Sequence, residues 1–408
     1  MTKPIKLIHT GDLHIGIQNY GRLDSTTGLH TRLKDFLDTF DNLVSYAVDT
    51  GQNAVLISGD IFKNREPDVT QQREFAKRIK TLSDARINVY IIIGNHDLHN
   101  AAYKATSVEI YDVLDMPYVY VRKRPSVDVI DTPNGPFQVV ALPYISPSNM
   151  NIEGTTIEEI SLSIRKGIEG LIDGLVKQLD NTLPTVLMSH FSIIGAVPGS
   201  EKSILLGREV TLPVSFFARP EFDYVAMGHI HKYQTLYLDP PVVYCGSMDR
   251  VDFNEEKEDK GFVEVSLSKG NAEYEFIKLP TRPFKTIYVT ADDGDDPFEK
   301  TLSEIKKYDL KDAIVKLKVK LPAQNLPMLK EKELLKILRE NTFYVAGIEK
   351  NIVSDLSHLR HPGITERMSV SQAIREYINK KDEYTALESE LLKVNDDLIQ
   401  ELKGEGSI

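Results

Sequence analysis

Aspartate, histidine and asparagine side chains recur at the ends of apolar segments in this chain of 408 residues. Seven of them form a candidate set of donors: Asp12, His14, Asp60, Asn95, His190, His229 and His231. Oxygen and imidazole donors suit divalent ions such as Mn²⁺, with Mg²⁺, Fe²⁺ or Zn²⁺ as alternatives, and offer nothing to copper(I) or an iron–sulfur cluster. The pattern therefore predicts a site for divalent metal ions.

The size of this donor set indicates more than one ion. Seven donors are too many for a single catalytic ion that must keep a position open for water. They suit two ions if one carboxylate bridges, and ions about 3.5–4 Å apart are the usual arrangement for in-line displacement at phosphorus. Such ions lower the pKa of a bridging water and neutralise phosphate oxygens as charge develops. The set predicts a two-metal phosphoesterase.

Two further polar residues directly follow Asn95. If strand alternation persists, His96 points away from Asn95, so its imidazole is free to protonate a leaving alkoxide as a general acid. The alternative is that His96 supports a metal-binding side chain and takes no part in the reaction. Asp97 is expected to orient an imidazole or to hold the turn. Five other histidines do not follow a strand end and are assigned structural or surface roles: His9, His30, His99, His358 and His361. Of these, His9 is expected to be buried.

Five apolar segments deliver the candidate donors. They span residues 6–10, 54–58, 89–93, 185–189 and 223–227, and their β-branched composition is typical of strands buried on both faces. Amphipathic helices are expected over 33–48 and around 75–82, between the first three strands. This alternation predicts a layered α/β fold with parallel pairing, in which polar groups at the carboxyl ends of the strands meet in one crevice.

The segments between and beyond these strands follow other patterns. Short runs over 119–142, broken by Pro125 and Pro133, predict antiparallel strands or hairpins. The alternating runs 261–267 and 274–279 predict a second, antiparallel sheet. A long helix is predicted between 157 and 179, with one apolar stripe formed by Ile160, Ile164, Ile168, Leu171, Leu175 and Leu179.

Composition excludes several classes of protein. A hydrophobic content of 41% and a charged content of 27% are ordinary for a soluble globular protein. No apolar run approaches the ~20 residues of a membrane span, and the N-terminus lacks the pattern of a signal peptide. The single cysteine, Cys245, fits a reducing cytoplasm. The net charge of −11 argues against indiscriminate binding of nucleic acid, although bound cations can create a local groove.

We predict three domains, with boundaries near Pro280–Pro283 and residue 366. Residues 1–280 form the catalytic domain, and residues 281–366 form a small α+β domain with strands near 287, 314–321 and 345 and helices near 302 and 334–338. In residues 367–408, Ser369 and Gln372 match a capping box. The tail has helically spaced apolar positions at Ile374, Ile378, Tyr384, Leu387, Leu391, Val394 and Leu398. We expect this tail to dock on a partner helix; the alternative is that it folds back on its own domain.

The polar blocks resemble a known family. Asp12-Leu-His14, Gly59-Asp60, Gly94-Asn95-His96-Asp97, His190 and Gly228-His229-Ile230-His231 resemble, in order, the motifs of calcineurin-like metallophosphoesterases. Tyr244-Cys-Gly-Ser247 and Lys260-Gly-Phe262 extend the resemblance to SbcD-type double-strand-break repair nucleases. The resemblance implies a two-sheet β-sandwich flanked by helices, a small α+β capping domain that engages DNA, and a C-terminal helix-loop-helix.

The resemblance also implies roles for individual residues. Asp12, His14, Asp60 and His231 would hold one Mn²⁺; Asp60, Asn95, His190 and His229 would hold the other; and His96 matches the catalytic histidine. One position departs from the pattern, because Lys63 stands where relatives usually carry Asp or His. A lysine there can pair with a phosphate as a point charge. What orients His96 and which DNA ends are cleaved therefore stay open.

The activity implied by the resemblance is that of a Mn²⁺-dependent 3′→5′ exonuclease and single-strand or hairpin endonuclease. It implies a homodimer that works in the cytoplasm, at the nucleoid in a prokaryote, with an SbcC-type coiled-coil ABC ATPase docked on the C-terminal helices. The sequence leaves two alternatives open. One is a small-molecule or cyclic-nucleotide phosphoesterase, and the other is a scaffold that tethers DNA ends around a largely structural metal site.

Overall fold

The structure is a computed structural model that describes residues 3–99, 104–147, 150, 154, 156–200, 210–353, 372, 375 and 389–395. Its contacts define two compact units. The first comprises Met1–Ile287, Asp309–Lys316 and Leu335–Gly347, and the second comprises Tyr288–Tyr308, Leu317–Leu334 and Ile348–Ile408. Among the described helices, none combines the length and apolar character needed to cross a membrane.

The first six-stranded sheet has the order β12-β11-β1-β2-β3-β4. Its strands are β1 (Ile5–Thr10), β2 (Ala54–Ile57), β3 (Asn88–Ile92), β4 (Val119–Arg122), β11 (Gly261–Ser268) and β12 (Asn271–Lys278). Strands β1 to β4 pair in parallel, and β11 and β12 continue the sheet in antiparallel pairing. The carboxyl ends of β1, β2 and β3 therefore lie at one edge, as the sequence predicts.

The second six-stranded sheet has the order β5-β6-β7-β8-β10-β9. Its strands are β5 (Ser126–Ile130), β6 (Phe137–Leu142), β7 (Thr185–His190), β8 (Tyr224–Gly228), β9 (Gln234–Leu238) and β10 (Pro241–Tyr244). The two sheets face each other across one apolar core, to which Leu7 and Leu56 contribute from the first sheet and Val139 and Met188 from the second. The predicted α/β architecture of two sheets flanked by helices is confirmed.

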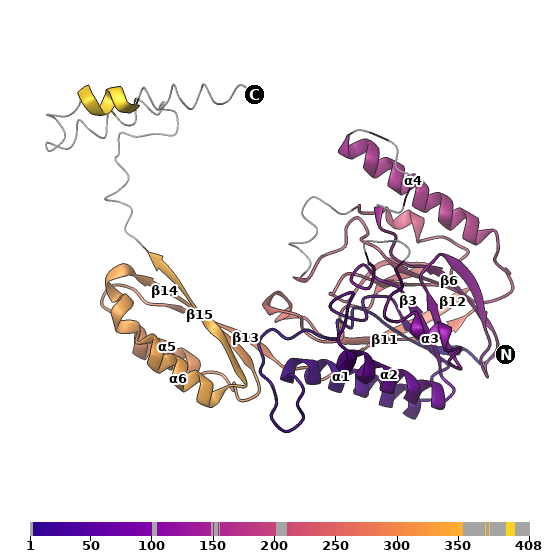
Figure 1. Ribbon diagram of the computed structural model, residues 1–408, viewed down its shortest axis with the longest axis horizontal. Coiled ribbons are helices and arrows are strands. Elements are labelled where there is room, and N and C mark those ends of the chain that lie inside the picture. Colours follow the sequence, from indigo (N-terminus) through magenta and orange to yellow (C-terminus); the bar gives the residue numbers. More distant parts are fainter. Residues whose placement is uncertain are drawn as a thin grey trace. The chain divides into compact units, whose positions relative to one another are not determined.

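Helices cover the outer face of each sheet. Helices α1 (Thr31–Asp49) and α2 (Val69–Asp84) pack on the first sheet, and α4 (Ile157–Val176) packs on the second (Figure 1). The short elements are α3 (Ile110–Val113), η3 (Val214–Phe216), η4 (Phe253–Glu255) and η5 (Ala323–Leu329). The predicted stripe of α4 is wrong at Leu171, which is exposed, while Ile172 is fully buried. The helix packs along the i, i+4 row Ile164, Ile168 and Ile172, and Leu171 lies off that row.

Two predictions about sheet pairing need correction. Strands β5 and β6 are antiparallel as expected, but β4 pairs in parallel with β3, and β6 pairs in parallel with β7. The alternating runs that become β11 and β12 do not form a separate sheet, because β11 pairs with the free edge of β1. Periodicity identifies a strand and its buried face. Which strand it pairs with, and whether in parallel or antiparallel, depends on distant sheet edges whose backbone groups need hydrogen-bond partners.

A three-stranded sheet has the order β13-β14-β15. Its strands are β13 (Phe284–Thr290), β14 (Ile314–Pro322) and β15 (Tyr344–Val353), and its helices are α5 (Pro297–Ile305) and α6 (Glu331–Asn341). These are the elements predicted for the small α+β domain. Of the predicted tail positions, Leu391 and Val394 are described and exposed. The other five, together with the capping residue, lie outside the described residues: Ile374, Ile378, Tyr384, Leu387, Leu398 and Ser369.

Candidate metal centre

The loops that follow the central strands have an unusual backbone. Asp12, His14, Asp60 and His229 have φ angles of 49°, 41°, 52° and 97°. Residues other than glycine rarely adopt such angles, at a cost of order 1–3 kcal/mol each, and they cluster at functional sites. The loop after β1 is tied to the loop after β2, since the backbone N–H groups of Asp12 and His14 donate to the carbonyls of Gly59 and Asp60, both at 3.0 Å.

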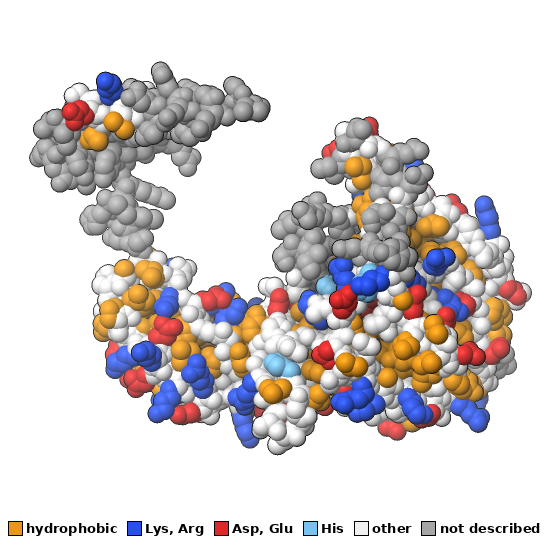
Figure 2. Space-filling view, in the orientation of Figure 1, with side chains coloured by type: hydrophobic (Ala, Val, Ile, Leu, Met, Phe, Trp, Pro, Cys, Tyr) orange, Lys and Arg blue, Asp and Glu red, His pale blue; other side chains and the backbone are white. Residues whose placement is uncertain are grey.

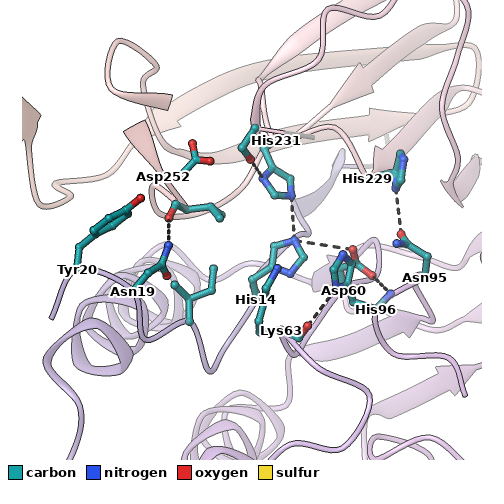
Figure 3. Close-up of a pocket in the computed structure, with 13 residues that line it drawn as sticks. His14, Asn19, Tyr20, Asp60, Lys63, Asn95, His96, His229, His231 and Asp252 are labelled. Atoms are coloured by element: carbon teal, nitrogen blue, oxygen red, sulfur yellow. Dashed lines mark hydrogen bonds and ion pairs between the residues drawn. The ribbon is translucent and has the colours of Figure 1, made fainter. Parts of the chain in front are cut away.

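One group of predicted donors lies around His14. The Nε2 atoms of His14 and His231 are 2.9 Å apart, and His14 Nε2 is 3.8 Å from Asp60 Oδ2 (Figure 3). Donor atoms of Asp12, His14 and His231 lie within 4.8 Å of one another. These side chains come from the loops after β1, β2 and β8, so residues separated by more than 200 positions share one small volume.

A second group lies around Asn95. Its Oδ1 atom is 3.0 Å from both His190 Nε2 and His229 Nδ1, and His190 Nε2 is 3.4 Å from Asp60 Oδ2. Asp60 Oδ2 thus faces His14 in the first group and His190 in the second. The structure brings all seven predicted donors together, with one carboxylate between the two groups.

The charges of the cluster fit a cation site. Burial raises the pKa of Asp12 to about 6. Burial also opposes ionisation of Asp60, but its attraction to His190 and His14 outweighs this and holds the pKa of Asp60 well below its ordinary value. Burial lowers the pKa of His190, whereas the two carboxylates raise it, to about 10. Buried carboxylates of this kind require positive charge, which a divalent ion supplies more strongly than a proton.

Glycine at two positions allows the strand ends to approach closely. A Cβ atom on Gly94 would overlap the backbone nitrogen and Oδ1 of Asp60. A Cβ atom on Gly59, where φ is +92°, would lie 2.5 Å from His190 Nδ1. The glycines that precede the donors in the sequence are therefore steric requirements of the site.

His96 lies beside these donors. Its Nδ1 is 3.0 Å from the backbone carbonyl of Lys63, which can only accept, so Nδ1 carries a proton and Nε2 is left for the cavity. Strand β3 ends at Ile92, so strand alternation does not set the direction of His96, and both Asn95 and His96 line the same cavity. Burial lowers the pKa of His96 below its ordinary value.

Asp97 is buried and holds the turn. Its carboxylate accepts hydrogen bonds from the backbone N–H groups of Gly94 at 3.0 Å, Ile61 at 3.1 Å and Phe62 at 3.4 Å. It therefore joins the loop after β3 to the loop that carries Asp60. This contact corresponds to the second of the two roles expected for Asp97.

A cavity of about 350 Å³ opens over the cluster (Figure 3). It is lined by His14, Ile17, Asn19, Tyr20, Asp60, Lys63, Asn95, His96, Ser200, His229, His231, Val251 and Asp252. In the described part of the chain, no carboxylate forms an ion pair with the Lys63 ammonium. Lys63 thus brings positive charge to the wall of a cavity that otherwise offers carboxylates and imidazoles.

The three other described histidines, His9, His30 and His99, do not line the cavity. His9 is fully buried, as predicted, with Nδ1 3.0 Å from the Tyr224 hydroxyl. His30 caps α1, and His99 lies 3.9 Å from Glu66. His358 and His361 lie outside the described residues.

Sequence reasoning missed Glu255, which is completely buried and lies behind His231. Its Oε1 is 2.9 Å from His231 Nδ1, and its Oε2 is 2.8 Å from the ammonium of Lys260. Burial opposes ionisation of Glu255, but Lys260 and His231 outweigh it and hold the pKa of this carboxyl well below its ordinary value. Six acidic residues lie between positions 249 and 259, and no local pattern separates Glu255 from the other five.

The sequence is similar to a known protein family and to a characterised protein. The sequence model of the family described as calcineurin-like phosphoesterase matches residues 5–233, which include all seven donors. The DNA double-strand break repair protein Mre11 of Haloferax volcanii is 24% identical over 313 residues, 76% of this chain and 60% of that protein. The chain thus spans less than two thirds of the length of that relative.

Solved structures of two other proteins are also similar. The protein TT1561 of Thermus thermophilus has a TM-score of 0.38 and 14% identity, over 67% of this chain and 99% of that one. A dimetal phosphatase from Danio rerio has a TM-score of 0.36 and 10% identity, also over 67% of this chain and 99% of that one.

Proposed function

Because the chain belongs to the calcineurin-like phosphoesterase family, we propose that it is a metal-dependent nuclease that hydrolyses DNA phosphodiesters during double-strand-break repair. The observation that carries the proposal is the convergence of seven oxygen and imidazole donors from five strand ends around Asp60. The similarity to a DNA double-strand break repair protein over 76% of the chain supports DNA as the substrate.

The donors fit two divalent ions. Asp12, His14, Asp60 and His231 would hold one, and Asp60, Asn95, His190 and His229 would hold the other, with Mn²⁺ as the proposed metal. When bound, such a pair of ions activates water as a nucleophile and neutralises charge on the phosphate. The loop hydrogen bonds and the close approach at Gly59 and Gly94 hold the donors in position relative to one another.

His96 is the proposed general acid. The Lys63 carbonyl fixes the ring through its Nδ1 proton, so Nε2 faces the cavity. When the ring carries a second proton, on Nε2, that proton is available to the leaving oxygen. The backbone of residue 63 orients His96, so the side chain of Lys63 is free for another role. We propose that it contacts a substrate phosphate and influences which DNA ends are cleaved, by 3′→5′ exonuclease or single-strand and hairpin endonuclease action.

The charge of the surface is consistent with local contacts to DNA. Basic and acidic side chains are interspersed over the visible face (Figure 2), and the chain carries a net charge of −11. Affinity for a polyanion must therefore come from particular sites such as Lys63 and bound cations.

The single cysteine, Cys245, which is free and buried, fits the cytoplasmic location proposed for such a nuclease.

Two exposed apolar surfaces support the proposed partners. Around α3, Ile110, Val113 and Leu114 are 52%, 82% and 68% exposed, which is unusual for large apolar side chains so close together. We propose that this surface pairs with a second copy of the chain.

In the tail, the exposure of Leu391 and Val394 supports docking of the C-terminal helices on an SbcC-type coiled-coil ATPase.

The test compares hydrolysis of an end-labelled DNA duplex by the purified full chain and by His96→Ala, with Mn²⁺ and after chelation. His99→Ala, three residues away and outside the cavity, is the matched control. The proposal expects metal-dependent cleavage that falls about 10²–10⁴-fold in His96→Ala and is unchanged in His99→Ala. End binding without cleavage would indicate the tethering scaffold, and hydrolysis of small phosphodiesters but not of DNA would indicate the small-molecule phosphoesterase.

A further inference from the structure

A buried carboxylate holds the His231 ring from the side away from the cavity. Glu255 Oε1 lies 2.9 Å from His231 Nδ1, and the Ser200 hydroxyl lies 2.5 Å from the same Oε1 and 2.9 Å from the same Nδ1. An ionised carboxylate only accepts hydrogen bonds, so the ring proton lies on Nδ1. His231 Nε2 then presents its lone pair toward His14 Nε2, 2.9 Å away.

A buried ammonium holds both that carboxylate and the backbone of the same histidine. Lys260 is fully buried, and its Nζ lies 2.8 Å from Glu255 Oε2, 2.9 Å from Glu258 Oε2 and 2.9 Å from the Ser247 hydroxyl. The same Nζ donates to the backbone carbonyl of His231 at 3.0 Å. Lys260 therefore fixes His231 at two points, through its carbonyl directly and through its ring by way of Glu255.

This arrangement does more than stabilise the fold. A buried ion pair contributes little net stability compared with apolar residues of the same volume. A carboxylate bonded to the far nitrogen of an imidazole, in contrast, fixes the tautomer, orients the ring and makes it a stronger ligand. Glu255 also accepts from the backbone N–H of Val251 at 2.9 Å, so its second oxygen is held as well.

The second group of donors is supported differently. The Nδ1 atom of His190 lies 2.6 Å from the backbone carbonyl of Ser58, a neutral acceptor. Removal of the Glu255–Lys260 pair would leave that contact intact. The two ion sites thus depend on different supports, and the charged support serves the site that contains His231.

We propose that Glu255 and Lys260 are positioning residues that set the affinity of one of the two metal ions, the one held by Asp12, His14, Asp60 and His231. This inference rests on the two-ion site of the proposed function. Neither residue lines the cavity, so neither contacts the substrate there, and both act through His231.

The test is a titration of the metal-free full chain with MnCl₂, monitored by calorimetry and by electron paramagnetic resonance. Both methods count bound ions without any measurement of activity. The main variant is Glu255→Gln/Lys260→Met, which removes both charges and nearly conserves volume. Glu258→Gln is the matched control, because Glu258 contacts the same Lys260 ammonium but not His231. A second measurement is the ¹⁵N chemical shift of the His231 ring in the metal-free wild type.

The proposal expects the double variant to bind one Mn²⁺ about 10–100-fold more weakly and the other with unchanged affinity, while Glu258→Gln binds both as wild type does. It also expects the wild-type ring to be protonated on Nδ1. The inference would be overturned if a folded double variant bound both ions with the wild-type affinities. It would also be overturned if the wild-type His231 ring were protonated on Nε2, even though wild type binds two ions. A wild type that binds no Mn²⁺ would overturn both this inference and the proposed function.

Discussion

The close approach of Gly94 to Asp60 makes a sharp prediction for Gly94→Ala. The new methyl would overlap the backbone nitrogen and Oδ1 of Asp60 and would lie 2.8 Å from its Cγ, whereas ordinary contact begins at 3.4 Å. The φ angle of Gly94 is not in the left-handed region, so steric overlap alone causes the effect. Because Asp60 faces both groups of donors, its displacement disturbs both ion sites at once.

The magnitude follows from that overlap. To restore ordinary contact, the backbone nitrogen of Asp60 must move from 2.4 Å to about 3.4 Å from the new methyl, a shift of about 1 Å. Overpacking of this kind costs about 1–3 kcal/mol. A displacement near 1 Å in a reacting constellation costs about 10²-fold in rate. We therefore expect Gly94→Ala to remain folded, to lose about 1–3 kcal/mol of stability, and to hydrolyse DNA about 100-fold more slowly.

The assay combines urea unfolding, Mn²⁺ titration and hydrolysis of a labelled duplex. Gly170→Ala is the matched control, since a Cβ there meets nothing within 4 Å and the residue lies inside helix α4. The control should gain about 0.5–1 kcal/mol from improved helix propensity and keep full activity. Wild-type metal binding and hydrolysis in Gly94→Ala would refute the argument that the strand ends are packed against Asp60.

Three further predictions follow from other parts of the molecule. Lys63→Gln should weaken DNA binding and lower the slope of log affinity against log salt by about 0.9 for a lost phosphate contact; the turnover number should hold because a backbone carbonyl orients His96, and an unchanged slope would contradict the phosphate contact. Val113→Asp should convert a dimer to a monomer in sedimentation analysis while Val48→Asp on α1 does not; a dimeric Val113→Asp would place the interface elsewhere. Burial opposes ionisation of Asp128, but hydrogen bonds from Arg122, Tyr90 and Ser126 outweigh it and lower its pKa. Asp128→Asn should therefore lose about 1–3 kcal/mol of unfolding free energy at neutral pH, and this deficit should shrink as the pH falls below about 4; a deficit independent of pH would refute the role of the charge.

The donors could be predicted from sequence because each lies next to a local signal. A buried strand ends, a glycine follows, and a polar side chain comes next, as at Gly59-Asp60 and Gly94-Asn95. The parallel sheet then brings these ends to one edge. The metal-binding roles of these residues remain proposals, although their proximity is a feature of the structure.

The supports of the site could not be predicted in the same way. Glu255 lies in a strongly charged stretch, and only its burial and its contact with the distant His231 distinguish it. Lys260 belongs to a motif of the resemblance, but the motif does not indicate its contacts with Glu255 and His231. The contact that orients His96 uses the backbone carbonyl of Lys63, which no side-chain pattern encodes. Pairing of β11 with β1 likewise depends on a free edge created by residues more than 200 positions away. Contacts of this kind are non-local, so periodicity and spacing do not contain them.

The proposed function requires Asp60 to lie between two bound cations. The most direct measurement is the anomalous difference density of crystals of the full chain soaked in Mn²⁺. We expect two peaks about 3.5–4 Å apart, one beside His14 and His231, the other beside Asn95 and His190, with the Asp60 carboxylate touching both. A single peak, no peak, or two peaks held by other side chains would contradict it.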